Sequence, residues 1–327
     1  MTSKGAILVA GGAGYIGAQT CKALAQSGYL PVTLDNLSTG YQAAVRWGPF
    51  YQGDLRDRDL VHKIIAEHAI IGALHFAAYS LVGESVRDPA KYYDNNVGAA
   101  TVFASSLVEA GVRALVFSST AAVYGTPTCS PILETAPTVP INPYGASKLA
   151  FEGALHWLGQ AHDLNWTALR YFNAAGADPD GEVGESHVPE THLIPLLCKA
   201  ALGTGPGLTV FGQDYDTPDG TPIRDYIHVA DLANAHVLAI ARLIAGGDSQ
   251  ILNVGTGEGA TVMQMIAAAQ KLGLSVPYTV GPRRAGDPPS LVADSSKLQA
   301  LLGWKPSCSD LETLISDAMR WQKNPLY

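Results

Sequence analysis

Short hydrophobic runs alternate along the chain with stretches in which hydrophobic residues recur at helical spacing. The short runs are typical of buried strands, and the longer periodic stretches are typical of helices packed on one face. The predicted strands are residues 6–10, 31–35, 50–53, 73–78, 114–120, 166–172 and 251–254. The predicted helices between them include 16–27, 59–68, 89–110 and 144–161.

This alternation indicates βαβ units, which build a parallel sheet with helices on both faces. We therefore predict an α/β fold with a doubly wound (Rossmann) parallel sheet. The pattern changes after Phe172, where residues 173–225 are rich in Gly, Pro, Asp and Thr and hold one predicted helix at 190–202. The alternation returns at 226–256. We predict a larger domain from 1–173 plus 226–256 and a smaller α/β domain from 174–225 plus 257–327.

Composition and charge narrow the class of protein. Hydrophobic residues make up 47% of the 327 residues and charged residues 15%, which is typical of a globular protein. The net charge of −8 argues against general nucleic-acid binding, which needs a basic face. No apolar run is long enough to span a bilayer, and residues 1–10 show no signal-peptide pattern, so we expect a cytoplasmic protein without a membrane partner. The four cysteines form no CxxC pair and are predicted to be free thiols.

A glycine-rich turn follows the first predicted strand and opens the first helix. Gly11, Gly14 and Gly17 keep a GxxGxxG spacing, which lets the backbone approach a pyrophosphate at the helix N-terminus. The motif alone would also fit an ordinary glycine-rich turn. Asp35, which ends the second strand, strengthens it, because a carboxylate there accepts the ribose hydroxyls of NAD and repels the 2′-phosphate of NADP. The sequence Asn36-Leu37-Ser38 that follows holds no arginine, so we predict NAD.

A second motif carries candidate catalytic groups. Tyr144 and Lys148 are four residues apart at the start of a predicted helix and therefore share one helix face. A nearby cation lowers the pKa of a phenol, so we expect Tyr144 to act as a base near neutral pH. Thr120 ends the fifth strand, at the sheet edge where ligands bind, and could hydrogen-bond a substrate hydroxyl. Alternatively, Tyr144 and Lys148 could be an ordinary aromatic–lysine pair on a helix, and Thr120 could only satisfy backbone groups at the strand end.

These motifs resemble those of the extended short-chain dehydrogenases/reductases. Longer signatures resemble the UDP-glucose 4-epimerases, from Gly11 almost to the C-terminus. They are residues 76–78 (FAA), 82–85 (VGES), 92–96 (YYDNN), 118–125 (SSTAAVYG), 170–173 (RYFN), 210–212 (VFG), 224–229 (RDYIHV) and 283–287 (RRAGD).

The resemblance implies a fold, a reaction and a set of residues. It implies that Tyr144 removes the proton of the sugar C4 hydroxyl, that Thr120 hydrogen-bonds that oxygen, and that Lys148 tunes Tyr144 and holds the nicotinamide ribose. The residues implied to contact NAD are Gly11, Gly14, Tyr15, Ile16, Gly17, Asp35, Asn36, Asp54, Leu55, Phe76, Ala77, Ala78, Asn95, Ser118, Tyr144, Lys148 and Tyr171. Those implied to hold the UDP-sugar in the smaller domain or beside it are Thr120, Asn173, His192, Leu193, Thr209, Phe211, Arg224, Arg284, Asp287 and Leu291.

The sequence departs from the family pattern at two positions. Ser80 stands where the family often has a lysine, and His192 stands where it often has an asparagine. The spacing of His187, Glu190 and His192 fits no standard metal site, so we expect no metal. His75, in a strand, is predicted to be structural.

Two other functions on the same fold are weighed against the epimerase. Nucleotide-sugar 4,6-dehydratases carry an acidic residue directly after the Ser/Thr of strand five, whereas this chain has Ala121 and Ala122, which disfavours that reaction. A non-catalytic NAD-sensing regulator would not need the intact set of Thr120, Tyr144 and Lys148.

The resemblance also implies a homodimer formed through helices 89–110 and 144–161.

Leu291 bears on substrate breadth. The resemblance places it beside the sugar, where epimerases restricted to plain hexoses often have tyrosine and those that accept N-acetylhexosamines have a smaller residue. We expect a pocket of intermediate size, with UDP-glucose and UDP-galactose as the best substrates. Leu291 could also serve only to pack against its neighbours.

Overall fold

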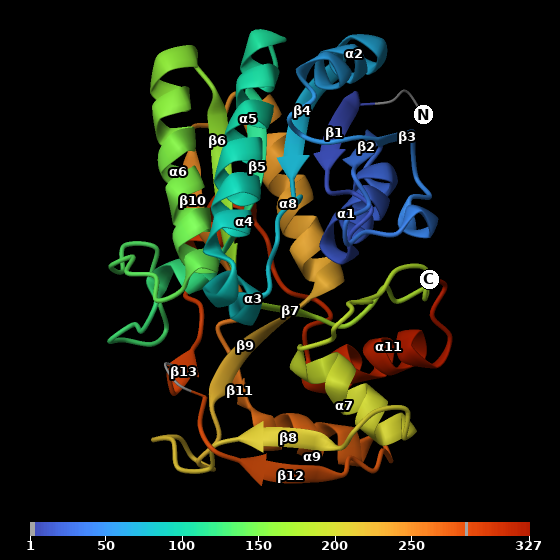
Figure 1. Cartoon of the computed structure of the whole chain (residues 1–327), viewed down its shortest axis with the longest axis vertical. Helices are drawn as coiled ribbons and strands as arrows, with labels where there is room; N and C mark the ends of the chain where they lie inside the picture. The colour runs from blue at the N-terminus through green and yellow to red at the C-terminus, as the bar shows by residue number, and fades with distance from the viewer. Residues whose placement is uncertain (1–3, 285–286) are drawn as a thin grey trace.

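The computed structural model describes residues 4–284 and 287–327 of the chain. A large parallel sheet with its helices forms the upper part of the molecule in Figure 1, and a smaller group of strands and helices lies below it. The C-terminus lies beside helix α11 (Leu311–Lys323).

The large sheet has seven strands in the order β10-β6-β5-β4-β1-β2-β3, and every pairing in it is parallel. Strands β2 and β3 add to one side of β1, whereas β4, β5, β6 and β10 add to its other side. The strand order thus reverses between β1 and β4, and ligands bind at such a point in open α/β sheets. The predicted fold class, a doubly wound parallel sheet, is confirmed. The strands are β1 (Ala6–Ala10), β2 (Leu30–Asp35), β3 (Phe50–Gln52), β4 (Ile70–His75), β5 (Ala114–Thr120), β6 (Asn165–Tyr171) and β10 (Gln250–Val254).

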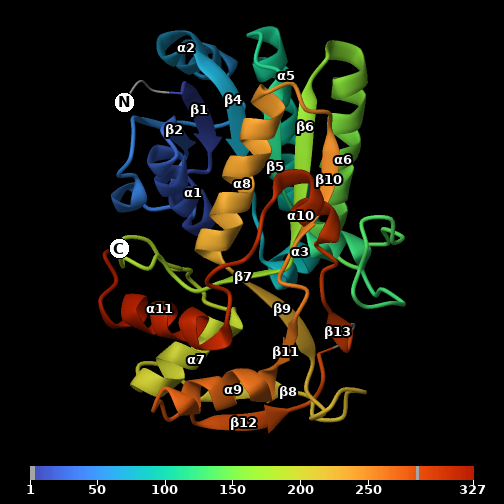
Figure 2. The same ribbon diagram turned by 180° about the vertical axis from the view of Figure 1, so that it is seen from behind.

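Helices cover both faces of this sheet. Helices α2 (Arg58–His68), α5 (Ala100–Glu109) and α6 (Pro143–His162) lie on one face, towards the viewer in Figure 1. Helices α1 (Tyr15–Gln26), α8 (Val229–Ile244) and α10 (Ser296–Leu302) lie on the other, which faces the viewer in Figure 2.

The strand pattern explains the two cores. Along β1, Leu8 and Ala10 pack into the core beneath α2, α5 and α6, whereas Ile7 and Val9 pack into the core beneath α1 and α8. Successive side chains of a strand point to opposite faces, so a strand that is covered on both sides must be hydrophobic throughout.

Strand β4 ends at His75, three residues before the predicted end. The N–H groups of Phe76 and Ala77 both donate to the carbonyl oxygen of Ala10, at 2.8 and 3.2 Å, so the chain turns away from the sheet there. The segment after β4 is therefore free to line a pocket.

The helix predicted over 89–110 is a helix with a widened turn. It consists of α4 (Pro89–Tyr93), a π-helical stretch (Asp94–Ala99) and α5. Within the stretch, the Asn96 side chain accepts from the N–H of Tyr79 and donates to its carbonyl oxygen. Such widened turns often occur at functional sites.

Beneath the large sheet, strands from distant parts of the chain pair with one another. Strand β9 (Ile223–His228) pairs with β7 (Asn173–Ala175), β11 (Gly259–Thr261) and β13 (Ser290–Leu291), while β8 (Leu208–Phe211) pairs with β12 (Tyr278–Gly281). Helices α7 (Leu193–Leu202), α9 (Val262–Lys271) and α11 share a core with these strands. The domain bounds drawn from the sequence stay a prediction.

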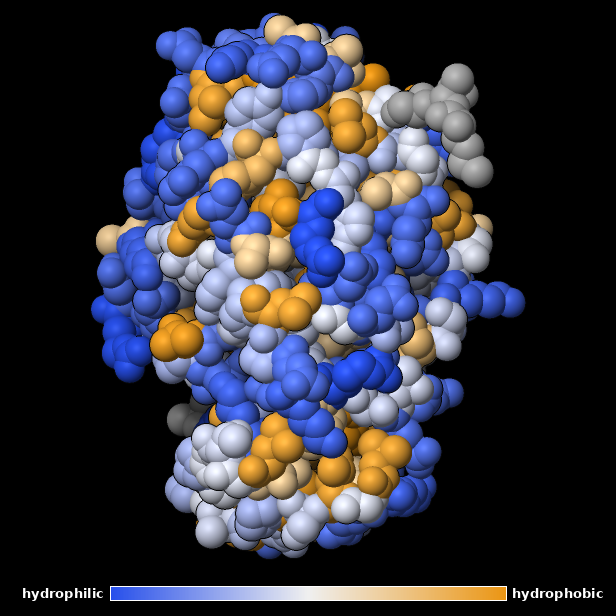
Figure 3. All heavy atoms as spheres, turned by 90° about the vertical axis from the view of Figure 1, so that its right-hand side faces the viewer, coloured by the Kyte–Doolittle hydropathy of each residue, from blue (hydrophilic) through white to orange (hydrophobic). Residues whose placement is uncertain are grey.

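Three short elements complete the described part of the chain. They are α3 (Val82–Arg87) and two 3-10 turns, Gln42–Ala44 and Ala121–Tyr124. The face that carries α1 above and α11 below is largely hydrophilic, with hydrophobic residues in small groups (Figure 3). None of the helices within 4–284 and 287–327 is long and apolar enough to cross a membrane.

Candidate active site

A cavity of about 1230 Å³ lies beyond the carboxyl ends of the large sheet's strands and reaches the smaller group of strands below. All the site residues predicted from the sequence line it, except Ser118. The chain thus brings residues from Gly11 to Leu291 to one cavity, with groups from the large sheet on one wall and groups from β8, β9 and α7 on the other.

The glycine-rich turn is held so closely that two of its glycines tolerate no side chain. Gly11 has φ +82°, and a Cβ on it would lie 2.5 Å from the backbone nitrogen of Ala77. A Cβ on Gly17 would overlap with the carbonyl oxygen of Gly11. Gly14 is different, because its nearest neighbour allows a Cβ at ordinary contact distance. The protein itself therefore requires Gly11 and Gly17, whereas Gly14 faces the cavity.

The first turn of α1 and the end of β2 fit a dinucleotide. Gly14 caps α1 without a side-chain hydrogen bond, so the first N–H groups of the helix are available to a phosphate on the cavity side. Asp35 lies at the end of β2, and its two carboxylate oxygens accept from the N–H groups of Ala13 and Leu37 at 3.0 and 2.8 Å. A carboxylate keeps further acceptor sites for ribose hydroxyls. The residues present therefore fit NAD.

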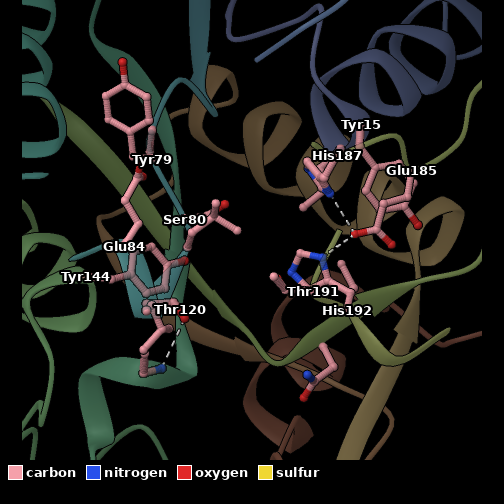
Figure 4. Close-up of a pocket in the computed structure, with 18 of the residues that line it drawn as sticks. Tyr15, Tyr79, Ser80, Glu84, Thr120, Tyr144, Glu185, His187, Thr191 and His192 are labelled. Carbon is pink, nitrogen blue, oxygen red and sulfur yellow. Dashed lines mark hydrogen bonds and ion pairs between the residues drawn. The ribbon is translucent and has the colours of Figure 1, made fainter. Parts of the chain in front are cut away.

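The candidate base lies in the first turn of α6. The Asn142 side chain accepts from the N–H of Gly145 at 2.8 Å, which caps the helix, and Pro143 occupies its first position. This start places Tyr144 on the cavity wall near Thr120, as Figure 4 shows. Lys148, one turn later, donates to the carbonyl oxygen of Ser118 at 2.8 Å.

Burial dominates the protonation of this pair. It raises the pKa of Tyr144, and only a hydrogen bond with Thr120 opposes the rise. It also lowers the pKa of Lys148 to about 7, with the charge of Glu152 acting in the opposite direction. The Lys148 Nζ lies 6.0 Å from the centre of the Tyr144 ring. The lowering of the Tyr144 pKa that we expected from Lys148 is therefore not produced by the protein side chains.

Ser118 is buried below the cavity wall. Its hydroxyl lies 3.1 Å from Nε2 of His236, and its carbonyl oxygen accepts from Lys148. The contact between Ser118 and NAD that the resemblance implied stays a prediction. Its observed contact with the site is through the ammonium group of Lys148.

A buried network that the sequence analysis missed holds the catalytic helix in place. Glu152, on the helix face of Lys148, pairs with Arg170 of β6 at 2.6 Å and accepts from the hydroxyl of Ser119 at 2.6 Å. Glu152 stands four residues after Lys148 and therefore lies on the same helix face as Tyr144 and Lys148. This spacing could have predicted from the sequence that Glu152 belongs to the site. The network fixes α6 against β5 and β6.

Charged residues meet on the substrate-side wall. Arg224 of β9 forms an ion pair and hydrogen bond with Asp287. The Arg284 guanidinium lies over the Phe211 ring, 4.2 Å from its centre. The face of Phe211 is thus in contact with Arg284 in this structure.

Leu291 on β13 is the pairing partner of Arg224 on β9, so the two residues lie side by side. It lines the cavity, and it also packs against a small core that includes Ala121 and Tyr124. Both roles considered from the sequence are compatible with this position. Ser80 is exposed and lines the cavity as well.

A group of glutamates and histidines lies on the wall opposite Tyr144 (Figure 4). Burial would lower the pKa of His192, but hydrogen bonds with Glu185 and Glu190 raise it to about 10. Burial would likewise raise the pKa of Glu185, but bonds with His187 and His192 lower it to about 2. The sequence analysis considered His187, Glu190 and His192 together and did not include Glu185.

Comparison with known proteins agrees with this site. Residues 7–255 match the model of the NAD dependent epimerase/dehydratase family. The chain belongs to this family, whose members use a dinucleotide to act on their substrates.

Within the family, the chain belongs with the UDP-glucose 4-epimerases. It is 49% identical to the enzyme of Lacticaseibacillus casei over 97% of both chains, and 50% identical to that of Rhizobium meliloti over 96% of both. A crystal structure of UDP-glucose 4-epimerase from Brucella ovis in complex with NAD matches with a TM-score of 0.94 and 49% identity, covering 96% of this chain and 97% of that one. The predictions of the family, of an isomerase and of NAD as cofactor are confirmed.

A further solved structure carries a sugar nucleotide. The enzyme from Stenotrophomonas maltophila, with bound NAD and formylated UDP-arabinopyranose, matches with a TM-score of 0.95 and 41% identity over 98% of both chains. The whole fold, including the substrate side, is therefore shared with an epimerase that holds a UDP-sugar.

Proposed function

We propose that the protein interconverts UDP-glucose and UDP-galactose through a 4-keto sugar, with Tyr144 as the acid and base. The observation that carries this proposal is the meeting of Tyr144, Lys148 and Thr120 with the glycine cradle at one cavity. Bound NAD supplies the chemistry of accepting the C4 hydride and returning it to the opposite face of the sugar. The family match supports the same reaction.

The side chains of this protein would move one proton and hold the reacting oxygen. Tyr144 takes the proton of the 4-hydroxyl and later returns it, while Thr120 donates or accepts a hydrogen bond at the same oxygen. Lys148, held by the carbonyl oxygen of Ser118, would hold the nicotinamide ribose. Burial opposes the ionisation of Tyr144, so the positive charge that favours the phenolate would come from the nicotinamide ring of bound NAD.

The substrate wall would hold the nucleotide and leave the sugar room to turn. We assign Arg224 and Arg284 to the diphosphate, because guanidinium groups bind phosphate oxygens in paired hydrogen bonds. Both residues already have protein partners, Asp287 and Phe211, so binding would exchange or share those contacts. The remaining assigned contacts are Asn173, His192, Leu193, Thr209 and Leu291.

The residues after β5 favour epimerisation over dehydration. Ala121 and Ala122 line the cavity directly after Thr120, and their methyl groups cannot move the C5 proton or protonate the 6-hydroxyl. A dehydratase needs an acid and a base at this place. Neither alanine can supply one.

We further propose a cytoplasmic homodimer that pairs through the α4–α5 segment and α6. Trp157 of α6 is 71% exposed and Tyr93 of α4 is 45% exposed, so aromatic side chains stand on the outer surface of these helices. Aromatic residues are enriched in protein interfaces. We also propose the two-domain division given above.

The decisive experiment is turnover of UDP-galactose by the purified protein without added NADH. Epimerisation gives UDP-glucose and no net change in NADH. A keto-deoxy sugar product would identify a dehydratase, and the absence of any product would favour an NAD-sensing regulator. Either of these outcomes would overturn the proposed function.

A further inference from the structure

Four side chains of the loop before α7 converge on one point of the cavity wall. The ligating atoms of Glu185, His187, Glu190 and His192 all lie within 4.8 Å of one another. The Nδ1 atoms of His187 and His192 lie 3.1 and 2.8 Å from the same oxygen of Glu185, and Figure 4 shows the two rings approaching it from either side. The His192 Nδ1 also lies 3.0 Å from Glu190.

The two carboxylates are buried, and one oxygen lacks a hydrogen-bond partner. The side chains of Glu185 and Glu190 are only 5% and 4% exposed. One oxygen of Glu190 accepts from the N–H groups of Thr191 and His192. Its other oxygen, Oε2, finds no hydrogen-bond partner in the described part of the chain and lies 3.9 Å from the Nδ1 of His187.

Buried carboxylates need a compensating positive charge. A second acidic group, formed by Asp178, Asp180 and Glu182, has one, because the Lys22 ammonium lies 2.6 to 2.9 Å from all three. Within residues 4–284 and 287–327, Glu185 and Glu190 pair with histidines and with no lysine or arginine. In the cluster before α7, the imidazolium of His192 supplies the compensating charge, and a divalent ion bound by the four side chains would displace its proton.

The donor set selects a type of metal. Two imidazole nitrogens and two carboxylates suit zinc and its neighbours among the first-row divalent ions, whereas magnesium and calcium prefer oxygen alone. In a tetrahedral zinc site with bonds of about 2.0–2.1 Å, neighbouring ligand atoms lie roughly 3.4 Å apart. The four histidine–glutamate separations of 2.8 to 3.9 Å bracket this value and all the ligand atoms lie within 4.8 Å of one another, so side-chain movements would complete the shell.

We propose that Glu185, His187, Glu190 and His192 form a binding site for a first-row divalent metal ion of the zinc class on the cavity wall. The ion would reach the site from the cavity, because all four residues line it and the histidines are 29% and 40% exposed. The expectation of no metal rested on sequence spacing alone, which does not include Glu185 and does not show that the loop folds back on itself.

The experiment measures metal binding directly on the full-length, tag-free protein with its NAD retained. After treatment with a chelator and its removal, Zn²⁺ is titrated by calorimetry and Co²⁺ by visible absorption. We expect one bound ion per chain, with cobalt absorption typical of nitrogen and oxygen ligands. Loss of a supporting residue around a metal commonly costs about 10–100-fold in affinity, so His187→Ala and Glu190→Gln, which remove ligands, should each weaken binding at least tenfold.

Matched controls separate the site from other metal contacts. His162→Ala removes an exposed histidine at the end of α6, and Glu182→Gln changes the acidic group that pairs with Lys22. Both should leave Zn²⁺ affinity unchanged, and thermal unfolding of each variant checks that it is folded. The nearly isosteric Glu190→Gln keeps the test valid if His187→Ala does not fold. Zn²⁺ binding in wild type that is no tighter than in the two cluster variants would overturn the proposal, whatever the turnover assay shows.

Discussion

The two walls of the cavity are built in different ways. On the dinucleotide side, most groups follow directly from the strands of a single parallel sheet, and Gly11 and Gly17 are fixed by backbone contacts. On the substrate side, strands from four separated parts of the chain pair with one another, and ion pairs and ring contacts such as Arg224–Asp287 set the surface. The first wall is therefore fixed by backbone geometry, whereas the second can be altered by single side chains.

This difference suits the proposed reaction. A cofactor that must stay bound needs a wall that does not change. A sugar that must present first one face and then the other needs space and few fixed contacts. We therefore expect substitutions on the dinucleotide wall to affect chemistry, folding or cofactor retention, and substitutions on the substrate wall to affect selectivity.

The largest effect is expected at the group that the two walls share. Tyr144→Phe removes the proton acceptor and keeps the ring, so turnover of UDP-galactose should fall by at least about 100-fold, the lower range for general acid–base catalysis. NAD should remain bound, because the phenol oxygen is not part of the glycine cradle. Absorbance of the purified variant measures bound NAD, and near-normal turnover would contradict the assignment of Tyr144.

The next effect tests the rigidity of the dinucleotide wall. In Gly17→Ala the new methyl group meets the carbonyl oxygen of Gly11, which is backbone and cannot move aside cheaply. We expect a loss of about 1–3 kcal/mol in the free energy of unfolding, the usual range for overpacking, together with loss of NAD. Denaturant unfolding gives the value. The control is Gly14→Ala, whose methyl group has room, and equal stability losses in the two variants would contradict the close-contact argument.

The third effect concerns cofactor choice. Asp35→Ala removes the carboxylate at the end of β2 and its bonds to Ala13 and Leu37, so NAD affinity should fall by roughly tenfold or more, as for the loss of a hydrogen bond to a charged group. Discrimination against NADP should fall with it. Asp35→Asn, which keeps one acceptor and loses the charge, separates the two effects. NADP found in the purified wild type would show that Asp35 does not select NAD.

The smallest effect is expected on the substrate wall. Steric gating by Leu291 predicts that Leu291→Tyr abolishes turnover of UDP-N-acetylgalactosamine and that Leu291→Ser raises it, while turnover of UDP-galactose changes little. The ratio of the two turnover rates in wild type and both variants is the measurement. An unchanged ratio would leave Leu291 with only its packing role against Ala121 and Tyr124.

The sequence pattern predicted the large sheet well because most of its strands, though not the edge strand β3, are buried and rich in hydrophobic residues. Strands β1 and β5 have the predicted bounds, 6–10 and 114–120. The end of β4 was missed, because the bonds of Phe76 and Ala77 to Ala10 that end it connect two strands and have no local signal. The short strands β7, β11 and β13 were also missed, since two or three residues carry no periodicity.

The sequence by itself determined the parallel sheet, the glycine turn, Asp35 and the Tyr144–Lys148 face, because each depends on local spacing and local chemistry. Only the tertiary structure decided that burial raises the pKa of Tyr144. Only it, too, decided that Ser118 lies behind Lys148 and that Glu185 joins His187 and His192 at one point. The physical reason is that burial, charge compensation and the meeting of distant strands depend on distances through space, which spacing along the chain does not contain.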